Sequence, residues 1–359
     1  MIDTNRFIEA LIIKGYDHLC VVPCSFAKNL INASINCGSK IEYIPCASEG
    51  VACSIAAGLK IAGKNPIIIS QSSGLTNMGS CITSLLSPYG IFFPILVSWR
   101  TYKEGDSEVQ HKHLAKALPD LVHAYGYEFD ILNKNNLNVA IEQILECNNS
   151  RKICILENKS FSDVNLEEKH KLDLSNFLPR SNYLKFLNNK FKNSKILFIG
   201  TTGNTSREMY SYMPDTQNFY MAGNMGGALS LGFGASKAGK NVFICGGDAE
   251  FVMHLGGLTT AGRYNGTGFN LTYILFDNES NKSTGGQKTQ QNHLKYIGIA
   301  KSAGITCFEF EIKKISEFSK AIDSMQKLLG IKFIHVKCSY DEETPRPPID
   351  KVINSNFAC

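Results

Sequence analysis

Short apolar runs rich in Ile, Val and Phe alternate with helical stretches along the whole chain, and few hairpin signals separate them. Strands that are spaced by helices pair in parallel, because a parallel neighbour needs a long crossover connection. Such sheets are covered by helices on both faces, so the pattern predicts an α/β fold with doubly wound parallel sheets. The expected strands of the first half are His18–Pro23, Ile41–Pro45, Pro66–Ser70, Phe93–Ser98 and Lys152–Glu157. Those of the second half are Lys195–Gly200, Asn218–Met221, Asn241–Gly246, Asn270–Phe276, Thr306–Phe310 and Lys332–Lys337.

An internal repeat indicates that the two halves share one topology. The segment Gly50–Ile68 aligns without gaps on Gly226–Ile244, and nine of the nineteen positions are identical, including the whole sequence AGKN. Each copy predicts a helix of small residues, a Gly-Lys-Asn turn and a buried strand. Unrelated α/β domains can converge on similar helix ends, because glycine is common there. Agreement at one fixed offset nevertheless favours two similar domains.

The pattern lapses between Asn158 and Asn182 into a charged stretch, which we interpret as an inter-domain linker. The chain has 359 residues, which is long for one core and suits two domains of about 150–180 residues. We therefore expect a first domain over residues 1–160, a linker over 161–180 and a second domain over 181–359.

The composition favours a globular, cytoplasmic protein. Hydrophobic residues make up 43% and charged residues 19% of the chain. No apolar run approaches the roughly 18–20 residues that span a bilayer, and the first residues do not resemble a signal peptide. The twelve cysteines follow neither a disulfide framework nor a metal-site spacing, so reduced thiols are expected. A net charge of +5 without a basic block argues against nucleic-acid binding and is compatible with a small anionic ligand.

A carboxylate and an amide follow two predicted strands of the second half. Gly247, Asp248 and Ala249 come directly after one strand, and Asn278 follows the next strand along the chain. Parallel strands end at the same sheet edge, where open α/β sheets bind their ligands. Asp and Asn oxygens suit Mg²⁺, and glycine lets backbone N–H groups approach a diphosphate. Taken alone, a Gly-Asp pair after a strand is often a simple turn.

This pattern resembles the thiamine-diphosphate signature, in which Gly-Asp-Gly is followed at a similar distance by Asn-Asn. Two residues depart from it: Ala249 stands for the second glycine, and Asp277 stands for the first asparagine. Both departures spare the positions that are expected to bind the metal ion. The resemblance implies thiamine diphosphate and Mg²⁺ as cofactors, with Asp248, Asn278 and Ser280 around the ion.

Segments along nearly the whole chain resemble phosphonopyruvate decarboxylases, a family close to sulfopyruvate decarboxylases. They are VPCS (22–25), SEGVA (48–52), QSSGLTNMGSCITSLLSP (71–88), SWR (98–100), SEVQH (107–111), TTGNTSRE (201–208), STGGQKT (283–289) and TPRP (344–347). Cys24 stands at a position where many members carry Asp. Gly227 stands at the position of the histidine in the Met-Gly-His sequence that is common in the family. These two departures bear on the substrate more than on the cofactor.

The resemblance implies a pyrimidine-binding first domain and a diphosphate-binding second domain. Glu49 would protonate the cofactor at N1′, whereas without a cofactor it is a helix N-terminal carboxylate stabilised by the helix dipole. Met225 would lie beneath the bent cofactor, although methionine is by default a core residue, and the carbonyl of Gly223 would hold the 4′-amino group. The other expected cofactor-binding residues are Thr201, Thr202, Gly203, Gly247, Asp248, Ala249 and Asn278.

The implied reaction is the decarboxylation of 3-phosphonopyruvate to phosphonoacetaldehyde and CO₂, a step of phosphonate biosynthesis. The two acidic groups of this substrate need cationic or hydrogen-bonding partners, for which family-like segments supply Arg100, His111 and Arg346, followed by Ser25, Gln110 and Lys288. The family also implies a homodimer or larger homo-oligomer with active sites at the interface.

Three alternatives stay open. Sulfopyruvate or another 3-substituted pyruvate is the nearest rival substrate, and a sulfonate carries one negative charge where a phosphonate carries up to two. A nicotinamide-dependent oxidoreductase is disfavoured, because no G-x-G-x-x-G directly follows a strand with an acidic residue further on. A non-catalytic protein that binds the cofactor structurally is compatible with the departures at Ala249, Asp277 and Gly227.

Overall fold

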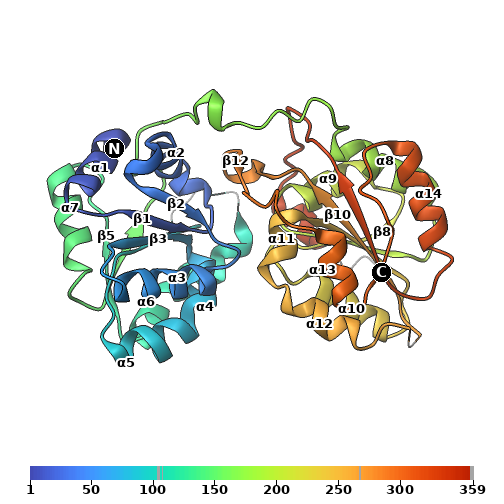
Figure 1. Cartoon of the computed structure of the whole chain (residues 1–359), viewed down its shortest axis with the longest axis horizontal. Coiled ribbons are helices and arrows are strands. Elements are labelled where there is room, and N and C mark those ends of the chain that lie inside the picture. Colours follow the sequence, from blue (N-terminus) through green and yellow to red (C-terminus); the bar gives the residue numbers. More distant parts are fainter. Residues whose placement is uncertain (103–105, 107, 267, 356–359) are drawn as a thin grey trace. The chain divides into compact units, whose positions relative to one another are not determined.

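The computed structural model describes residues 1–355 except 103–105, 107 and 267 (Figure 1). It divides into two compact units. Unit 1 contains Met1–Lys171 and Asn281–Lys288, and unit 2 contains Leu172–Ser280 and the chain from Thr289 onward. None of the helices in the described residues combines the length and the apolar character that a membrane span requires.

Unit 1 is built on a six-stranded sheet with the strand order β2-β1-β3-β4-β6-β5, and every pairing in it is parallel. The strands are β1 (His18–Val21), β2 (Glu42–Pro45), β3 (Pro66–Gln71), β4 (Ile95–Ser98), β5 (Glu128–Ile131) and β6 (Lys152–Leu156). The helices are α1 (Thr4–Ile13), α2 (Lys28–Asn36), α3 (Glu49–Ile61), α4 (Ser72–Cys81), α5 (Ser87–Tyr89), α6 (Lys112–Ala124) and α7 (Leu137–Glu146).

Helices cover both faces of this sheet. Successive strand residues point to opposite faces, so each face presents apolar side chains on which helices pack. In β3, the side chains of Ile67 and Ile69 pack in a core with residues of α1, α2 and α7. Ile68 packs in a second core with residues of α3, α4 and α6. All three isoleucines are fully buried, and burying each such side chain contributes about 1.5–3 kcal/mol. The predicted doubly wound parallel arrangement is confirmed.

Unit 2 is built on a second six-stranded parallel sheet, with the strand order β13-β14-β10-β9-β7-β8. The strands are β7 (Leu197–Gly200), β8 (Gln217–Tyr220), β9 (Val242–Gly247), β10 (Asn270–Asp277), β13 (Thr306–Cys307) and β14 (Gly330–Lys337). The helices are α8 (Arg180–Lys190), α9 (Asn204–Tyr212), α10 (Ala228–Lys237), α11 (Asp248–Met253), α12 (Gly256–Gly262), α13 (Tyr296–Ser302), α14 (Ile315–Met325) and α15 (Ile349–Asn354).

The two sheets have the same topology. When strands are numbered in chain order within each unit, both sheets read 2-1-3-4-6-5, with unit 2 read from β8. The first copy of the sequence repeat forms α3 and β3, and the second forms α10 and β9. The bounds of β3 and β9 coincide in the alignment of the two copies. The predicted likeness of the two halves is therefore confirmed.

Each strand expected from the sequence is present, with ends that differ by a few residues. The sequence did not predict β5, an edge strand of sequence EFDI whose two end residues are exposed. Its two acidic residues hide the apolar alternation by which strands are recognised. It also did not predict the two-residue strands β11 (Ser280–Asn281) and β12 (Gln287–Lys288).

The segment 281–288 belongs to unit 1, although its neighbours on both sides in the sequence belong to unit 2. The buried Gln287 donates from Nε2 to Oδ1 of Asn32 on α2, at 2.8 Å. Gly285 and Gly286 have φ angles of +136° and +84°, a region that favours glycine. A side chain at Gly285 would also collide with Lys28, so the two glycines let the segment approach α2 closely.

Candidate active site

The carboxyl ends of β1, β3 and β4 are neighbours in the sheet of unit 1. Ser25 follows β1, Gln71 ends β3, and Arg100 follows β4, so their side chains gather at one edge of the sheet. Cys24 lies at the same edge, fully buried, with its Sγ 2.8 Å from Oγ of Ser98. Open α/β sheets bind their ligands at this edge. Most of the substrate-binding residues that were predicted from the sequence lie here.

Arg100 is buried and already holds three hydrogen bonds. Its Nη1 donates to Oγ of Ser25 at 2.6 Å, and its Nε and Nη2 donate to the two oxygens of Asp106 at 2.8 Å each. The backbone N–H groups of Thr101 and Glu108 also donate to Asp106. Burial alone would raise the pKa of Asp106, but Arg100 and these N–H groups lower it to about 2. Arg100 and Asp106 therefore form an ion pair with no net charge.

His111 and Gln110 complete this cluster. Nε2 of His111 lies 3.0 Å from Nε2 of Gln71 and 3.4 Å from Nε2 of Gln110. Burial, followed by the positive charge of Arg100, lowers the pKa of His111 below its usual range, although Glu108 and Asp106 oppose this. Because both amide nitrogens are donors, Nε2 accepts, and the neutral imidazole carries its proton on Nδ1.

Glu49 begins α3, where the Oγ of Ser48 caps the helix by accepting from the N–H of Val51. The carboxyl group is buried, and its Oε2 accepts from Nδ2 of Asn77 at 2.8 Å. A Cβ atom on Gly74 would lie 2.5 Å from Oε1 of Glu49, so only glycine leaves room for the carboxyl group. The pair α3 and α4 thus fixes the position of Glu49.

In unit 2, the strands β9 and β10 are neighbours, and Asp248 follows β9. Its carboxylate is only 4% exposed, and Oγ1 of Thr289 donates to its Oδ2 at 3.3 Å. Burial, followed by the negative charge of Asp277, raises the pKa of Asp248 to about 7. A cation bound here would offset this burial cost and keep the carboxylate ionised.

Asn278 and Ser280 follow β10 and are both buried. Oδ1 of Asn278 accepts from the backbone N–H of Ser280 at 3.0 Å, which closes a tight turn. The Oγ of Ser280 is buried without a hydrogen-bond partner among the residues that the structure describes. A buried carboxylate, an amide oxygen and a hydroxyl without a described partner are hard oxygen ligands, which suit a divalent cation such as Mg²⁺.

The residues that are expected to bind the diphosphate follow β7, the strand next to β9. Thr201 is buried, Thr202 is half-buried and Gly203 is exposed with a φ of +78°. Gly203 caps the N-terminus of α9, so this turn presents backbone N–H groups where an anion is stabilised. On the loop after β8, Gly223 is exposed and Met225 is half-buried, while Gly247 and Ala249 flank Asp248.

Two further substrate candidates, Lys288 and Arg346, belong to other elements than Ser25, Arg100, Gln110 and His111. Lys288 is half-buried in β12 of unit 1, and Arg346 is exposed on the segment between β14 and α15 in unit 2. Within the described residues of unit 1, no hydrogen bond or ion pair joins Lys288 to Arg100. Their roles stay predictions.

Comparison with known proteins decides the family. The C-terminal TPP binding domain of thiamine pyrophosphate enzymes matches residues 199–336. The chain is 28% identical to a phosphonopyruvate decarboxylase from Streptomyces viridochromogenes, over 85% of this chain and 80% of that protein. It is 26% identical to a sulfopyruvate decarboxylase from Methanosarcina acetivorans, over 92% of this chain and 90% of that protein. It is 34% identical to the sulfopyruvate decarboxylase subunit beta of Methanocaldococcus jannaschii, over 44% of this chain and 84% of that subunit.

The chain belongs to the family of phosphonopyruvate and sulfopyruvate decarboxylases. It is a decarboxylase that depends on thiamine diphosphate, the cofactor also called thiamine pyrophosphate. The family resemblance in the sequence is confirmed, and so is the prediction of an enzyme of this class.

The structure explains why this decarboxylase tolerates Asp277 in place of the first asparagine of the signature. Oδ2 of Asp277 lies 3.0 Å from Nε2 of His335 and 3.1 Å from Nζ of Lys337, and both partners stand on the neighbouring strand β14. Burial by itself would raise the pKa of Asp277, but these partners lower it below its usual value. Lys337 also donates to Glu279. The ammonium group of Lys337 therefore compensates for the charge that Asp adds.

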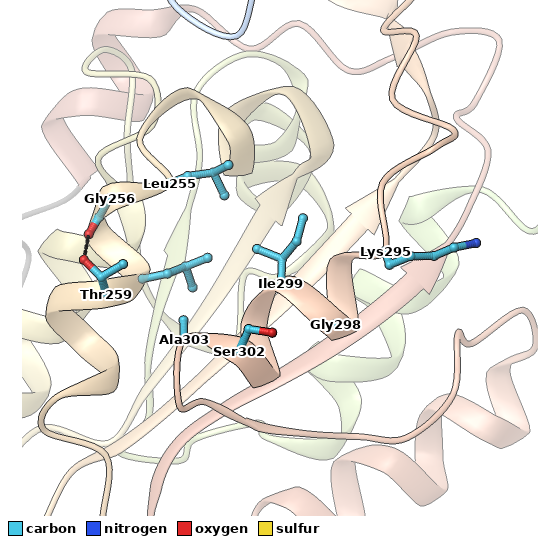
Figure 2. Close-up of a pocket in the computed structure, with 9 residues that line it drawn as sticks. Leu255, Gly256, Thr259, Lys295, Gly298, Ile299, Ser302 and Ala303 are labelled. Atoms are coloured by element: carbon cyan, nitrogen blue, oxygen red, sulfur yellow. Dashed lines mark hydrogen bonds between the residues drawn. The ribbon is translucent and has the colours of Figure 1, made fainter.

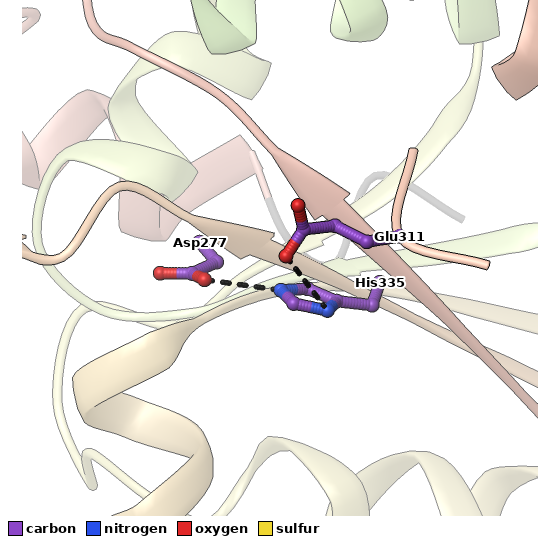
Figure 3. A group of neighbouring side chains, drawn as sticks. All are labelled: Asp277, Glu311 and His335. Atoms are coloured by element: carbon purple, nitrogen blue, oxygen red, sulfur yellow. Dashed lines mark hydrogen bonds and ion pairs between the residues drawn. The ribbon is translucent and has the colours of Figure 1, made fainter. Parts of the chain in front are cut away.

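Asp277 and His335 also lie near Glu311, whose Oε2 is 3.8 Å from Nδ1 of His335 (Figure 3). Three such side chains can in principle hold a metal ion. The ammonium group of Lys337 shares the same oxygen of Asp277, however, so a second cation would be repelled. We interpret the group as an ion-pair network.

The other departures in unit 2 also have local reasons. Ala249 lies inside α11, so its position needs no glycine conformation. A Cβ atom on Gly227 would lie 2.2 Å from Nδ2 of Asn224, so a histidine there would displace that side chain. Gly226 has a φ of +88°, and a Cβ atom there would lie 2.9 Å from the ring of His254, the residue that follows α11.

Sequence reasoning missed several residues that hold the predicted ones. They are hydrogen-bond partners or close neighbours of the predicted residues, namely Gln71, Gly74, Asn77, Asp106 and Thr289. Four of them lie within segments that resemble the family and Asp106 directly precedes one, and that was the available signal. Which residue each would contact depends on the folded helices and loops.

An apolar hollow of about 620 Å³ lies on unit 2 between α12 and α13 (Figure 2). It is lined mainly by small and aliphatic residues, among them Leu255, Leu258, Ile299 and Ala303, with Lys295 at one side. None of the predicted site residues lines it. The hollow therefore adds nothing to the site.

Proposed function

We propose that this enzyme decarboxylates 3-phosphonopyruvate to phosphonoacetaldehyde and CO₂ with thiamine diphosphate and Mg²⁺. The observation that carries the proposal is the presence of the two family sites in one chain. Glu49 is buried and fixed by Asn77 in unit 1, and Asp248 and Asn278 are buried at the ends of the neighbouring strands β9 and β10 in unit 2. Two phosphonopyruvate decarboxylases among the relatives are 28% identical to this chain, and the sulfopyruvate decarboxylase that matches nearly its whole length is 26% identical.

When bound, thiamine diphosphate supplies an electron sink for the charge that remains after CO₂ leaves. Glu49 would hold a proton at N1′ of its pyrimidine ring, and Asn77 keeps the carboxyl group in the required orientation. Met225 would support the bent cofactor, and the carbonyl of Gly223 would accept a hydrogen bond from its 4′-amino group. The turn Thr201–Gly203 would donate backbone N–H groups to the diphosphate.

Asp248, Asn278 and Ser280 would bind the Mg²⁺ ion, whose charge would offset the negative charge of the diphosphate. The buried carboxylate of Asp248 and the unpaired Oγ of Ser280 support this assignment. Removing divalent cations with a chelator should abolish retention of the cofactor, and added Mg²⁺ should restore it. The variant Asp248→Asn should retain no cofactor at Mg²⁺ concentrations that saturate the wild type. Full cofactor retention by this variant would contradict the assignment.

Sulfopyruvate is the second candidate substrate, because a sulfopyruvate decarboxylase matches 92% of this chain. The test is CO₂ release from phosphonopyruvate, sulfopyruvate and pyruvate, each over a range of concentrations. We expect kcat/KM to be highest for phosphonopyruvate and lowest for pyruvate, which lacks the second acidic group. Equal or higher kcat/KM for sulfopyruvate would overturn the substrate assignment but leave the enzyme class intact.

We further propose a homo-oligomer as the active form. In one relative, a separate beta subunit corresponds to less than half of this chain, so that function is divided between chains that assemble. Light scattering should give at least twice the mass of one chain. Mixing the inactive variants Glu49→Gln and Asp248→Asn should restore part of the activity if the two residues act together from different copies. A monomer with full activity would contradict the proposal.

A further inference from the structure

Gln110 presents a buried acceptor that no described residue satisfies. Its Nε2 donates to Oε2 of Glu108 at 2.8 Å. A carboxylate only accepts hydrogen bonds, so this contact fixes which end of the amide faces Glu108. The Oε1 at the other end is buried and has no hydrogen-bond partner among the described residues. An unpaired buried acceptor is costly, so it points to a donor that a ligand supplies.

The described side chains around Gln110 are already engaged with one another. Asp106 accepts two hydrogen bonds from Arg100, so this pair carries no net charge. Glu108 accepts a hydrogen bond from the amide of Gln110. Burial and Arg100 lower the pKa of His111, and its Nε2 accepts from Gln71. The Oε1 of Gln110 therefore remains open to a donor that a ligand supplies.

A singly ionised phosphonate has the matching chemistry. The group –PO₃H⁻ carries one negative charge and one P–OH donor, and phosphoryl groups exchange this second proton near neutral pH, at a pKa of about 6 for phosphates. A sulfonate, –SO₃⁻, carries the same charge but has no proton to donate. The unpaired Oε1 of Gln110 therefore distinguishes the two groups.

The acidic group that stays in the product is the one that suits this cluster. A guanidinium that held the departing carboxylate would stabilise the ground state more than the transition state and slow the loss of CO₂. Arg100 and Ser25 therefore suit the phosphonate, because this group keeps its charge throughout the reaction.

Building on the proposed function, we propose that Gln110 is a specificity-determining residue that binds the substrate phosphonate as its monoanion. The P–OH donates to Oε1 of Gln110, and an ionised oxygen accepts from the remaining N–H groups of Arg100 and from the hydroxyl of Ser25. His111 donates its Nδ1–H to the same end of the substrate.

The test compares wild type with Gln110→Leu at several pH values between 6 and 9. For wild type, kcat/KM with phosphonopyruvate should fall about tenfold per pH unit above the second pKa of the substrate, and with sulfopyruvate it should show no such fall. Gln110→Leu should lower kcat/KM for phosphonopyruvate by about 10- to 100-fold at pH 6.5 and change that for sulfopyruvate by less than about threefold. Gln326→Leu, at an exposed glutamine beyond α14, is the matched control and should leave both substrates unchanged.

Methylphosphonate and methanesulfonate serve as competitive probes that need no turnover of phosphonopyruvate. Methylphosphonate should inhibit wild type most strongly as its monoanion, and Gln110→Leu should lose this preference while methanesulfonate inhibits both equally. If phosphonopyruvate is not turned over but this pattern holds with another substrate, the proposed function fails and the binding inference stands. Equal losses for both substrates and both probes in Gln110→Leu would overturn the inference.

Discussion

Replacing Gly74 by alanine tests whether the position of Glu49 controls activity. The new Cβ would lie 2.5 Å from Cγ and Oε1 of Glu49 and 2.7 Å from its Cδ, whereas ordinary van der Waals contact begins at 3.4 Å. The carboxyl group must therefore retreat by about 1 Å, and displacements of this size at a reacting group cost on the order of 10²-fold in rate. We expect kcat to fall about 100-fold.

The same substitution should leave the fold intact. Gly74 lies in α4, where alanine is favoured over glycine by about 0.5–1 kcal/mol, and the side chain that must move is flexible. Gly58→Ala is the matched control, because Gly58 lies in α3 and a Cβ there meets no atom within 4 Å. The control should gain a similar stability and keep wild-type kcat.

The assay measures kcat for CO₂ release together with the urea concentration at half-unfolding for both variants. Gly74→Ala with kcat within twofold of wild type would refute the reasoning, because Glu49 would then tolerate displacement. So would an equal loss of kcat in Gly58→Ala, since that variant does not touch the carboxyl group.

Three further predictions concern stability. Burial lowers the pKa of Lys332 to about 8, so between about pH 8 and 10.5 the unfolded chain binds a proton that the folded chain has released. Across this interval the free energy of unfolding of wild type should rise by up to about 3 kcal/mol relative to that of Lys332→Met. If the difference in unfolding free energy between the two proteins does not change with pH, the prediction is wrong. Gly246→Ala should cost about 3 kcal/mol, because its Cβ would lie 2.1 Å from a buried tyrosine hydroxyl, whereas Gly247→Ala meets no atom within 4 Å and should change stability by less than about 1 kcal/mol. Asp277→Asn removes a buried partner of Lys337 and should lower the free energy of unfolding by about 2–4 kcal/mol, and an unchanged urea midpoint would argue against charge compensation.

The fold was predictable because buried parallel strands leave a strong apolar signal. The central strands β1, β3, β9 and β10 are buried on both faces, so the sequence shows them as apolar runs. Strand β5 escaped notice because it lies at the sheet edge, where charged residues are tolerated. The placement of residues 281–288 in unit 1 involves the hydrogen bond from Gln287 to Asn32 and two glycines, which no local pattern reveals.

The candidate site was predictable where it follows strand ends. Asp248 and Asn278 were expected at one sheet edge because neighbouring parallel strands end together, and β9 and β10 are neighbours. The neutralisation of Arg100 by Asp106 was not predictable, because no local pattern indicates which acidic residue pairs with Arg100. The same holds for Asn77, whose contact with Glu49 requires the close packing of α3 and α4.

The most direct test of the account is one reaction, followed by the phosphorus signals of substrate and product together with CO₂ release. Protein stripped of cofactor and metal is incubated with phosphonopyruvate, with and without added thiamine diphosphate and Mg²⁺. We predict that phosphonoacetaldehyde and CO₂ form in equal amounts only when both additions are present, and that Glu49→Gln forms neither at a comparable rate. Unchanged phosphonopyruvate in the complete mixture, or equal turnover by Glu49→Gln, would contradict it.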